Sequence, residues 1–296
     1  MKSRFDRRIV PFFLLLLAFL PLPSLADRLQ VFVSILPQQI LVERIGGEHV
    51  EVSLMVGSGR SPETYEPTPR QMADVAEARL YYRIGVPFEQ VWVPRIQEVN
   101  PALDLLDARD GIELREMEPA VGHHHDHDPG HTNHGNRDPH IWLSPPLIKI
   151  MAVKLRDRLV MMDPDHRADY TANCDRFLEE LDRLDSAIRV HLKGIVRRNF
   201  MVFHPSWGYF ADTYKLHQIP IESGGKEPGA RTLTRLIEGA KQKEIRVIFV
   251  QKQFSQRQAR ILAEAIDGTV AVIDPLSPDY PENLLGVAEA IAEASR

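Results

Sequence analysis

Four side chains that could bind a divalent metal ion stand in loops that follow or adjoin predicted strands. They are Glu63, His140, His204 and Asp274. His204 directly follows an apolar run that ends at Phe203, and Asp274 directly follows one that ends at Ile273. Because ligands gather at the carboxyl ends of strands in open parallel sheets, we expect the four side chains to meet. Two imidazoles and two carboxylates complete a tetrahedral shell for zinc. The same donors suit manganese or ferrous iron if a carboxylate binds through both oxygens or water joins.

A second group of histidines lies between Val121 and Asn136, a segment that holds six of the twelve histidines in the chain. Glycine, aspartate and proline interrupt it, which predicts a loop. The alternative is an ordinary solvated polar loop, but six imidazoles in so short a stretch favour metal contact. We therefore predict accessory metal binding by His123, His124, His125, His127, His131 and His134.

The elements that must position these residues alternate between strand and helix in both halves of the chain. Apolar residues at every second position predict strands, and each run is followed by a helical pattern. Such alternation is typical of parallel sheets covered by helices. The predicted strands are Leu29–Leu36, Val50–Val56, Leu80–Ile84, Phe200–Phe203, Arg246–Val250 and Thr269–Ile273.

Between the two halves, apolar residues recur with a 4-3-4-3-4 spacing at Tyr170, Cys174, Phe177, Leu181, Leu184 and Ile188. This spacing predicts one amphipathic helix. The helix is either a surface element of one domain or a bridge between two. We predict the bridge: an α/β fold of two parallel-sheet lobes joined by one long rigid helix, with the metal site in the cleft between the lobes. The expected boundaries are 1–26 for a signal peptide, 27–163 for the N-terminal lobe with the histidine-rich loop 121–136, 164–194 for the linking helix and 195–296 for the C-terminal lobe.

The N-terminus has the layout of a secretory signal peptide, in which basic residues precede the apolar run Ile9–Leu20. That run is shorter than the roughly 20 residues that span a bilayer, so we expect cleavage after Ala26 rather than a membrane anchor. No cysteine follows that site to carry a lipid, which predicts a free protein in the periplasm of a Gram-negative cell. Cleavage removes four basic residues and one acidic residue and so moves the formal charge from −5 to −8. This charge argues against a nucleic-acid partner. We expect a monomer.

Several further stretches make the sequence similar to a known family, the zinc and manganese solute-binding proteins of ABC transporters. The first motif of that family has the form Pro-His-x-Tyr/Phe-Glu-Pro, which stands here as Pro62-Glu63-Thr64-Tyr65-Glu66-Pro67. The other stretches occur in order over nearly the whole mature chain. They are Gly85–Glu89, Asp138–Pro145, Val202–Phe210, Ile248–Phe254 and Val272–Leu276.

The resemblance implies two α/β lobes bridged by a long helix, with metal ligands at His140, His204 and Asp274. It also implies a periplasmic protein that captures a metal ion and delivers it to a membrane ABC transporter permease, which works with a cytoplasmic ATPase. Glu63 departs from the family, since it replaces the first histidine. Either Glu63 supplies an oxygen ligand, or three protein ligands and water hold the ion. The histidine-rich loop favours zinc as the cargo, whereas the glutamate favours a harder ion such as manganese.

Three alternatives remain from the sequence. A manganese- or iron-binding homologue would have the same transport role, and a metal buffer or adhesin would share the site without a transporter. A metal-dependent hydrolase could use the same ligands to activate water. However, the chain has no His-Glu-x-x-His motif, and Ser206 lacks the Gly-x-Ser-x-Gly setting of a nucleophile elbow. We therefore predict a binding protein and not an enzyme.

Overall fold

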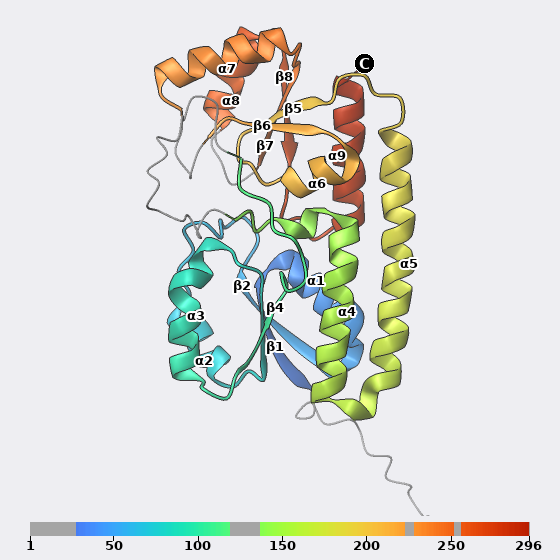
Figure 1. Ribbon diagram of the computed structural model, residues 1–296. Coiled ribbons are helices and arrows are strands. Elements are labelled where there is room, and N and C mark those ends of the chain that lie inside the picture. Colours follow the sequence, from blue (N-terminus) through green and yellow to red (C-terminus); the bar gives the residue numbers. More distant parts are fainter. Residues whose placement is uncertain (1–27, 119–136, 223–227, 252–255, 296) are drawn as a thin grey trace, which may run out of the picture.

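The computed structural model describes residues 28–118, 137–222, 228–251 and 256–295. The expected signal peptide and the six histidines between 123 and 134 lie outside the described residues. Two α/β lobes are stacked end to end (Figure 1), and each contains a four-stranded parallel sheet, ordered β2-β1-β3-β4 and β6-β5-β7-β8. The strands are β1 Leu29–Ile35, β2 Val50–Val56, β3 Leu80–Arg83, β4 Asp104–Asp107, β5 Asn199–Val202, β6 His217–Pro220, β7 Val247–Gln251 and β8 Thr269–Ile273.

Helices cover both faces of each sheet. The pair α2 and α3 packs together on one face of the N-terminal sheet, and α1, α4 and α5 pack together on the other (Figure 1). In the described parts of the chain, no helix is long and apolar enough to cross a membrane. The helices are α1 Leu36–Gly46, α2 Pro69–Ala76, α3 Pro87–Val99, α4 Pro145–Met162, α5 Arg167–His191, α6 Gly208–Tyr214, α7 Ala230–Gln242, α8 Gln256–Ala265 and α9 Tyr280–Ala294, with short 3₁₀ turns at Gly47–His49, Ile141–Leu143 and Pro164–His166.

Two hydrophobic cores form because successive residues of a strand point to opposite faces of its sheet. Phe200 and Val202 of β5 belong to the first core, which continues through α6 and α9 into the N-terminal lobe. Met201 of β5 and Phe203, the residue that follows β5, belong to the second core, beneath α7 and α8. The first core therefore extends across both lobes, whereas the second is confined to the outer layer of the C-terminal lobe.

The long helix predicted from the apolar spacing is confirmed as α5, which has 25 residues. At about 1.5 Å per residue it extends about 37 Å. It packs on α1 and α4 of the N-terminal lobe and on α9 of the C-terminal lobe. The helix contains no glycine or proline. Its buried side chains are those of the predicted stripe, Tyr170, Cys174, Phe177, Leu181, Leu184 and Ile188.

This arrangement predicts that the lobes move little on metal binding. Bending α5 would break backbone hydrogen bonds, and separating the lobes would open the shared first core. Small-angle scattering and structures of the metal-free and zinc-loaded protein should show changes confined to loops. A rigid-body rotation of tens of degrees would contradict the prediction.

Candidate metal centre

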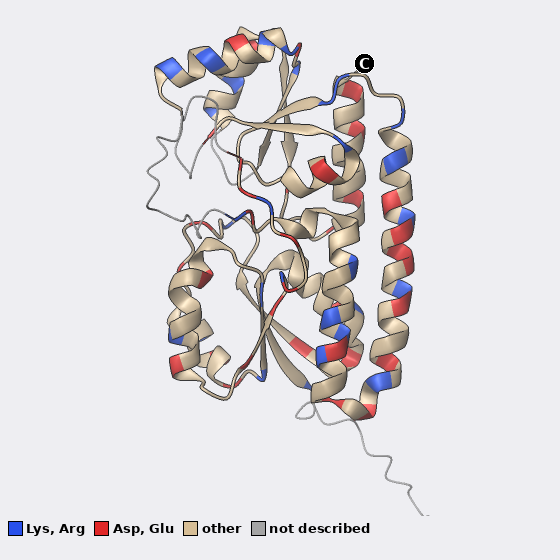
Figure 2. Ribbon diagram, viewed as in Figure 1, with Lys and Arg blue, Asp and Glu red and all other residues tan. Residues whose placement is uncertain are grey.

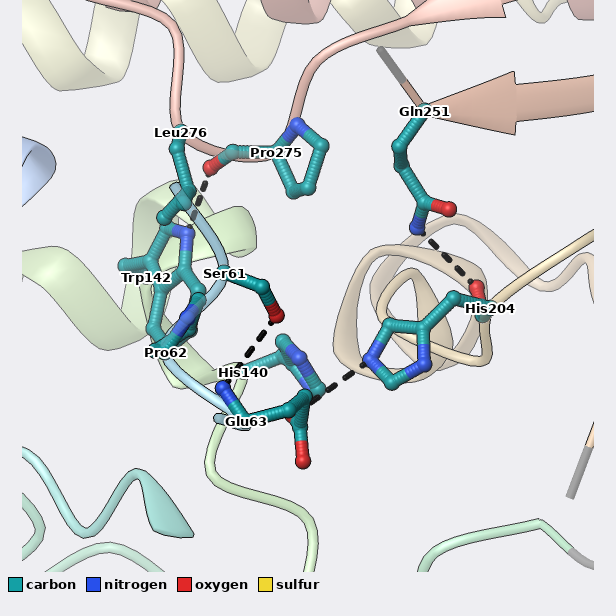
Figure 3. Close-up of a pocket in the computed structure, with 9 residues that line it drawn as sticks. All are labelled: Ser61, Pro62, Glu63, His140, Trp142, His204, Gln251, Pro275 and Leu276. Atoms are coloured by element: carbon teal, nitrogen blue, oxygen red, sulfur yellow. Dashed lines mark hydrogen bonds and ion pairs between the residues drawn. The ribbon is translucent and has the colours of Figure 1, made fainter. Parts of the chain in front are cut away.

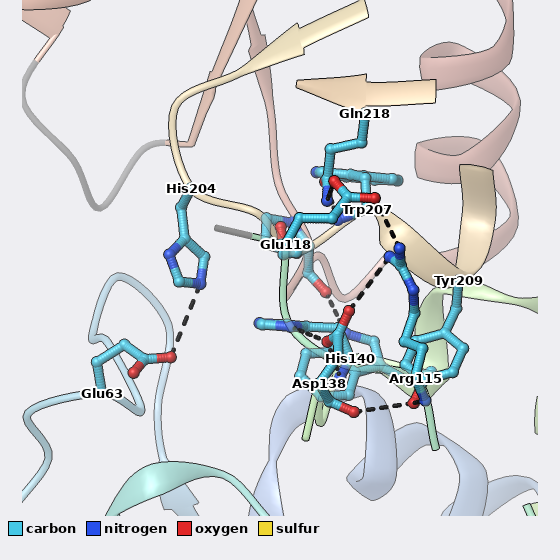
Figure 4. Close-up of polar contacts among 12 residues, drawn as sticks. Glu63, Arg115, Glu118, Asp138, His140, His204, Trp207, Tyr209 and Gln218 are labelled. Carbon is cyan, nitrogen blue, oxygen red and sulfur yellow. Dashed lines mark hydrogen bonds and ion pairs between the residues drawn. The ribbon is translucent and has the colours of Figure 1, made fainter. Parts of the chain in front are cut away.

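Glu63 lies in the loop between β2 and α2. Contacts of the neighbouring residues fix the course of this loop. Tyr65 packs edge-on against Phe88 of α3, with ring centroids 5.4 Å apart, and its hydroxyl donates to Gln71 Oε1 at 2.7 Å. The backbone amide of Phe88 donates to Pro62 O at 3.4 Å. These contacts hold the loop over the carboxyl end of the sheet. The Glu63 side chain is 27% exposed and points toward the C-terminal lobe (Figure 4).

His140 stands immediately before the 3₁₀ turn Ile141–Leu143 and is buried. Asp138 Oδ1 accepts from the His140 ring at Nδ1, 2.7 Å away, and from the His140 backbone amide at 3.0 Å. Because a carboxylate accepts, the ring must carry its proton on Nδ1. The lone pair of Nε2 is therefore available to a metal ion, the arrangement typical of histidine ligands supported by a carboxylate.

His204 follows β5 at the carboxyl edge of the C-terminal sheet and has the same support. Its Nδ1 lies 2.5 Å from Oε1 of Glu222, a buried carboxylate two residues after β6. Its backbone carbonyl accepts from Gln251 Nε2, at the end of β7, at 3.2 Å. Its Nε2 faces Glu63 Oε1 at 3.7 Å (Figure 3). Both imidazoles thus present Nε2 to one point between the lobes.

Glu63, His140 and His204 each offer one donor atom, and the three atoms lie within 4.8 Å of one another. In tetrahedral zinc sites with bonds of about 2.0–2.1 Å, donor atoms are about 3.3 Å apart. A small contraction would therefore place all three on one ion. Residues of both lobes line the cavity, whose volume is about 20 Å³, room for an ion or one water molecule. The other lining residues are Ser61, Pro62, Trp142, Gln251, Pro275 and Leu276 (Figure 3).

Asp274, the fourth predicted ligand, lies outside this group of three. Its Oδ1 accepts from the backbone amide of Leu276 at 3.0 Å, and its carbonyl accepts from Asn283 of α9 at 2.7 Å. The two residues after it, Pro275 and Leu276, line the cavity, and the Pro275 carbonyl accepts from Trp142 Nε1 at 2.7 Å. The turn that carries Asp274 therefore lies beside the site.

Sequence reasoning missed the carboxylates behind the two histidines. Asp138 stands two positions before His140 in Asp-Pro-His, a local signal that could have identified it. Glu222 is 18 residues from His204, and the two meet because β6 pairs with β5. No local pattern indicates that pairing.

The chain has two parallel-sheet lobes joined by a helix, with a candidate histidine–carboxylate site between them. This is the arrangement of a solute-binding protein for metal ions. A profile of the family described as "Zinc-uptake complex component A periplasmic" matches residues 31–294. The chain belongs to this family. The family is a periplasmic component of metal transport, so the chain is a transport protein and not an enzyme.

Individual relatives agree with the family assignment. The high-affinity zinc uptake system protein ZnuA of Bacillus subtilis is 30% identical over 257 residues, which are 86% of this chain and 80% of that protein. A solved structure described as the crystal structure of ZnuA is 41% identical, with a TM-score of 0.83, and the match covers 91% of this chain and all of that one. A zinc-bound ZnuA variant that lacks residues 138–173 of its own numbering matches with a TM-score of 0.82, 41% identity and coverage of 91% of this chain and 98% of that one.

Proposed function

We propose that this protein captures one zinc ion between its lobes and delivers it to the permease of a membrane ABC transporter that is driven by a cytoplasmic ATPase. The observation that carries the proposal is the convergence of three donor atoms from both lobes within 4.8 Å. Two are Nε2 atoms whose rings are already oriented by buried carboxylates, so binding requires little rearrangement. The relative named as a high-affinity zinc uptake protein and the zinc-bound ZnuA variant support zinc as the cargo.

In this proposal Glu63, His140 and His204 are ligands, and Asp274 is the fourth. Asp274 would join when the turn Asp274–Leu276 shifts toward the ion, because its neighbours already line the cavity. Glu63 replaces a neutral imidazole with a carboxylate, which makes the site harder and more negative. We therefore infer that manganese is a weaker second cargo and that zinc is preferred through the two imidazoles.

The finer features of this function rest on the sequence. We propose cleavage after Ala26, release into the periplasm without an anchor, and action as a monomer. The histidines at positions 123–134 would bind further zinc weakly through their imidazoles.

The test of function is zinc loading after chelator treatment. One ion should bind tightly per molecule, and it should add about 2.7 kcal/mol to the free energy of unfolding when free zinc is a hundredfold above the dissociation constant of the tight site. Manganese should give a smaller shift at equal concentration. In cells, removal of the protein should reduce zinc uptake under limiting zinc. A melting temperature that does not change with zinc, manganese or iron would reject the proposal.

A further inference from the structure

Arg115 lies in the segment that follows β4 and makes contacts to both lobes (Figure 4). Its guanidinium pairs with Glu118 at 2.6 Å and with Asp138 at 3.5 Å in its own lobe, and with Asp212 of α6 at 3.1 Å in the other. Its side chain is 17% exposed. Burial alone would lower the pKa of Arg115, but the three carboxylates raise it, so the guanidinium stays charged.

The contact with Asp138 connects Arg115 to the metal site. Asp138 is fully buried, and its Oδ1 accepts both hydrogen bonds from His140. Its Oδ2 faces Arg115 Nη1, and neither atom has a hydrogen-bond partner within the described residues. The ion pair with Arg115 thus compensates the negative charge of the buried Asp138 carboxylate at Oδ2. That carboxylate in turn orients the His140 ring.

The contacts with α6 connect the same arginine to the second histidine, because α6 begins four residues after His204. Tyr209 Oη accepts from the Arg115 amide at 3.1 Å and donates to the Asp138 carbonyl at 3.0 Å. Gly208 makes room for the guanidinium, since a Cβ there would lie 1.2 Å from Arg115 Nη1. The guanidinium can therefore occupy this place against α6 because position 208 has no side chain.

We propose that Arg115 is a positioning residue for metal capture, which sets the His140 ring relative to His204 by bridging Asp138 and α6. This inference rests on the proposed function. Its consequence is that zinc affinity depends on a side chain that never touches the ion. The expected loss on removing Arg115 is about 10–100-fold, the range for partners that orient metal ligands.

The first test compares Arg115→Met with Arg158→Met, a control in the same lobe. Arg158 of α4 also pairs with a carboxylate, that of Asp104, and its side chain is 26% exposed. Asp104 begins β4, so this pair lies at the amino end of the sheet, opposite the edge that carries the site. Zinc affinity, measured by chelator competition, should fall only in Arg115→Met. The visible spectrum of bound cobalt should change in that variant alone, and Arg115→Lys should recover part of both. Equal affinity and spectrum in parent and Arg115→Met would overturn the inference.

The second test covers the case in which Arg115→Met does not fold. Gly208→Ala should displace the guanidinium and lower zinc affinity by itself. The added Cβ would lie 1.2 Å from Arg115 Nη1 and 2.9 Å from Asp138 Oδ2, so the change disturbs the contact between these two groups. Combined with Arg115→Met it should add little, because both changes act on that one contact. Unchanged affinity in Gly208→Ala, or fully additive losses, would reject the bridge. Failure of the parent protein to bind zinc would instead reject the proposed function, so the two failures are distinguishable.

Discussion

Replacing His204 by alanine is expected to abolish tight zinc binding while leaving the metal-free protein folded. The change removes one of two imidazole ligands and leaves Glu222 buried without its ring partner. We expect a loss in zinc affinity of more than about 100-fold, above the range for residues that only orient ligands. The melting temperature should no longer rise with zinc. His140→Ala should behave alike, and an unchanged zinc titration in either variant would contradict the assigned site.

The same zinc titration tests whether Glu63 and Asp274 are ligands. Glu63→Ala should weaken zinc binding about as much as His204→Ala, whereas Glu66→Ala, an exposed residue of the same loop, should have no effect. Glu63→His should widen the preference for zinc over manganese. Asp274→Asn should weaken zinc binding less than Glu63→Ala, because the turn that carries Asp274 must first shift toward the ion. Parent-like binding of both metals by Glu63→Ala would show that water, not Glu63, completes the shell.

The second large effect is expected in stability, from Trp142. This side chain is 1% exposed and packs against the His140 ring at a centroid distance of 5.0 Å. Its Nε1 donates to the Pro275 carbonyl, and its own carbonyl accepts from Tyr280 of α9 at 2.9 Å, so it joins the lobes. Trp142→Ala should lower the free energy of unfolding by about 3–5 kcal/mol. Chemical denaturation of the metal-free protein measures this.

Trp207 provides the matched control, because it is also fully buried but its Nε1 has no hydrogen-bond partner within the described residues. Changing Trp207 to phenylalanine removes no hydrogen bond, whereas Trp142→Phe leaves the Pro275 carbonyl unsatisfied. That orphaned acceptor costs about 1–3 kcal/mol. Trp142→Phe should therefore destabilise more than Trp207→Phe. Equal losses would show that packing alone, and not the bond between lobes, accounts for the effect.

The fold was predictable where periodicity is long. The helix α5 repeats its apolar spacing from Tyr170 to Ile188, about five turns, and so long a repeat is recognisable from sequence alone. The central strands β1, β5 and β7 are also apolar enough to be recognised. The short strands β4 and β6 were not predicted. Each has four residues and lies at an edge of its sheet, where few apolar side chains are needed. The predicted first strand ran one residue too far, because Leu36 already begins α1 before Pro37.

The site was predictable only as a list of residues. His204 could be proposed because it directly follows a predicted strand, and His140 because it stands just after the histidine-rich loop. Each also stands in a recognisable motif. The carboxylate that orients each histidine is set by tertiary contacts, which the sequence does not show. Glu222 and Arg115 were therefore not predicted. The placement of Asp274 outside the group of three has the same cause, since its orientation is set by Leu276 and Asn283.

The division into two cores has a consequence for how the protein unfolds. His204 directly follows Phe203, and Glu222 directly follows Ile221, and both of these apolar residues belong to the second core. His140 precedes Ile141, which belongs to the first. An ion held as proposed therefore ties together two layers that hydrophobic packing leaves separable. We therefore expect zinc to make unfolding more cooperative. With zinc bound, the outer layer of the C-terminal lobe should melt together with the rest of the molecule, and without zinc that layer should melt first.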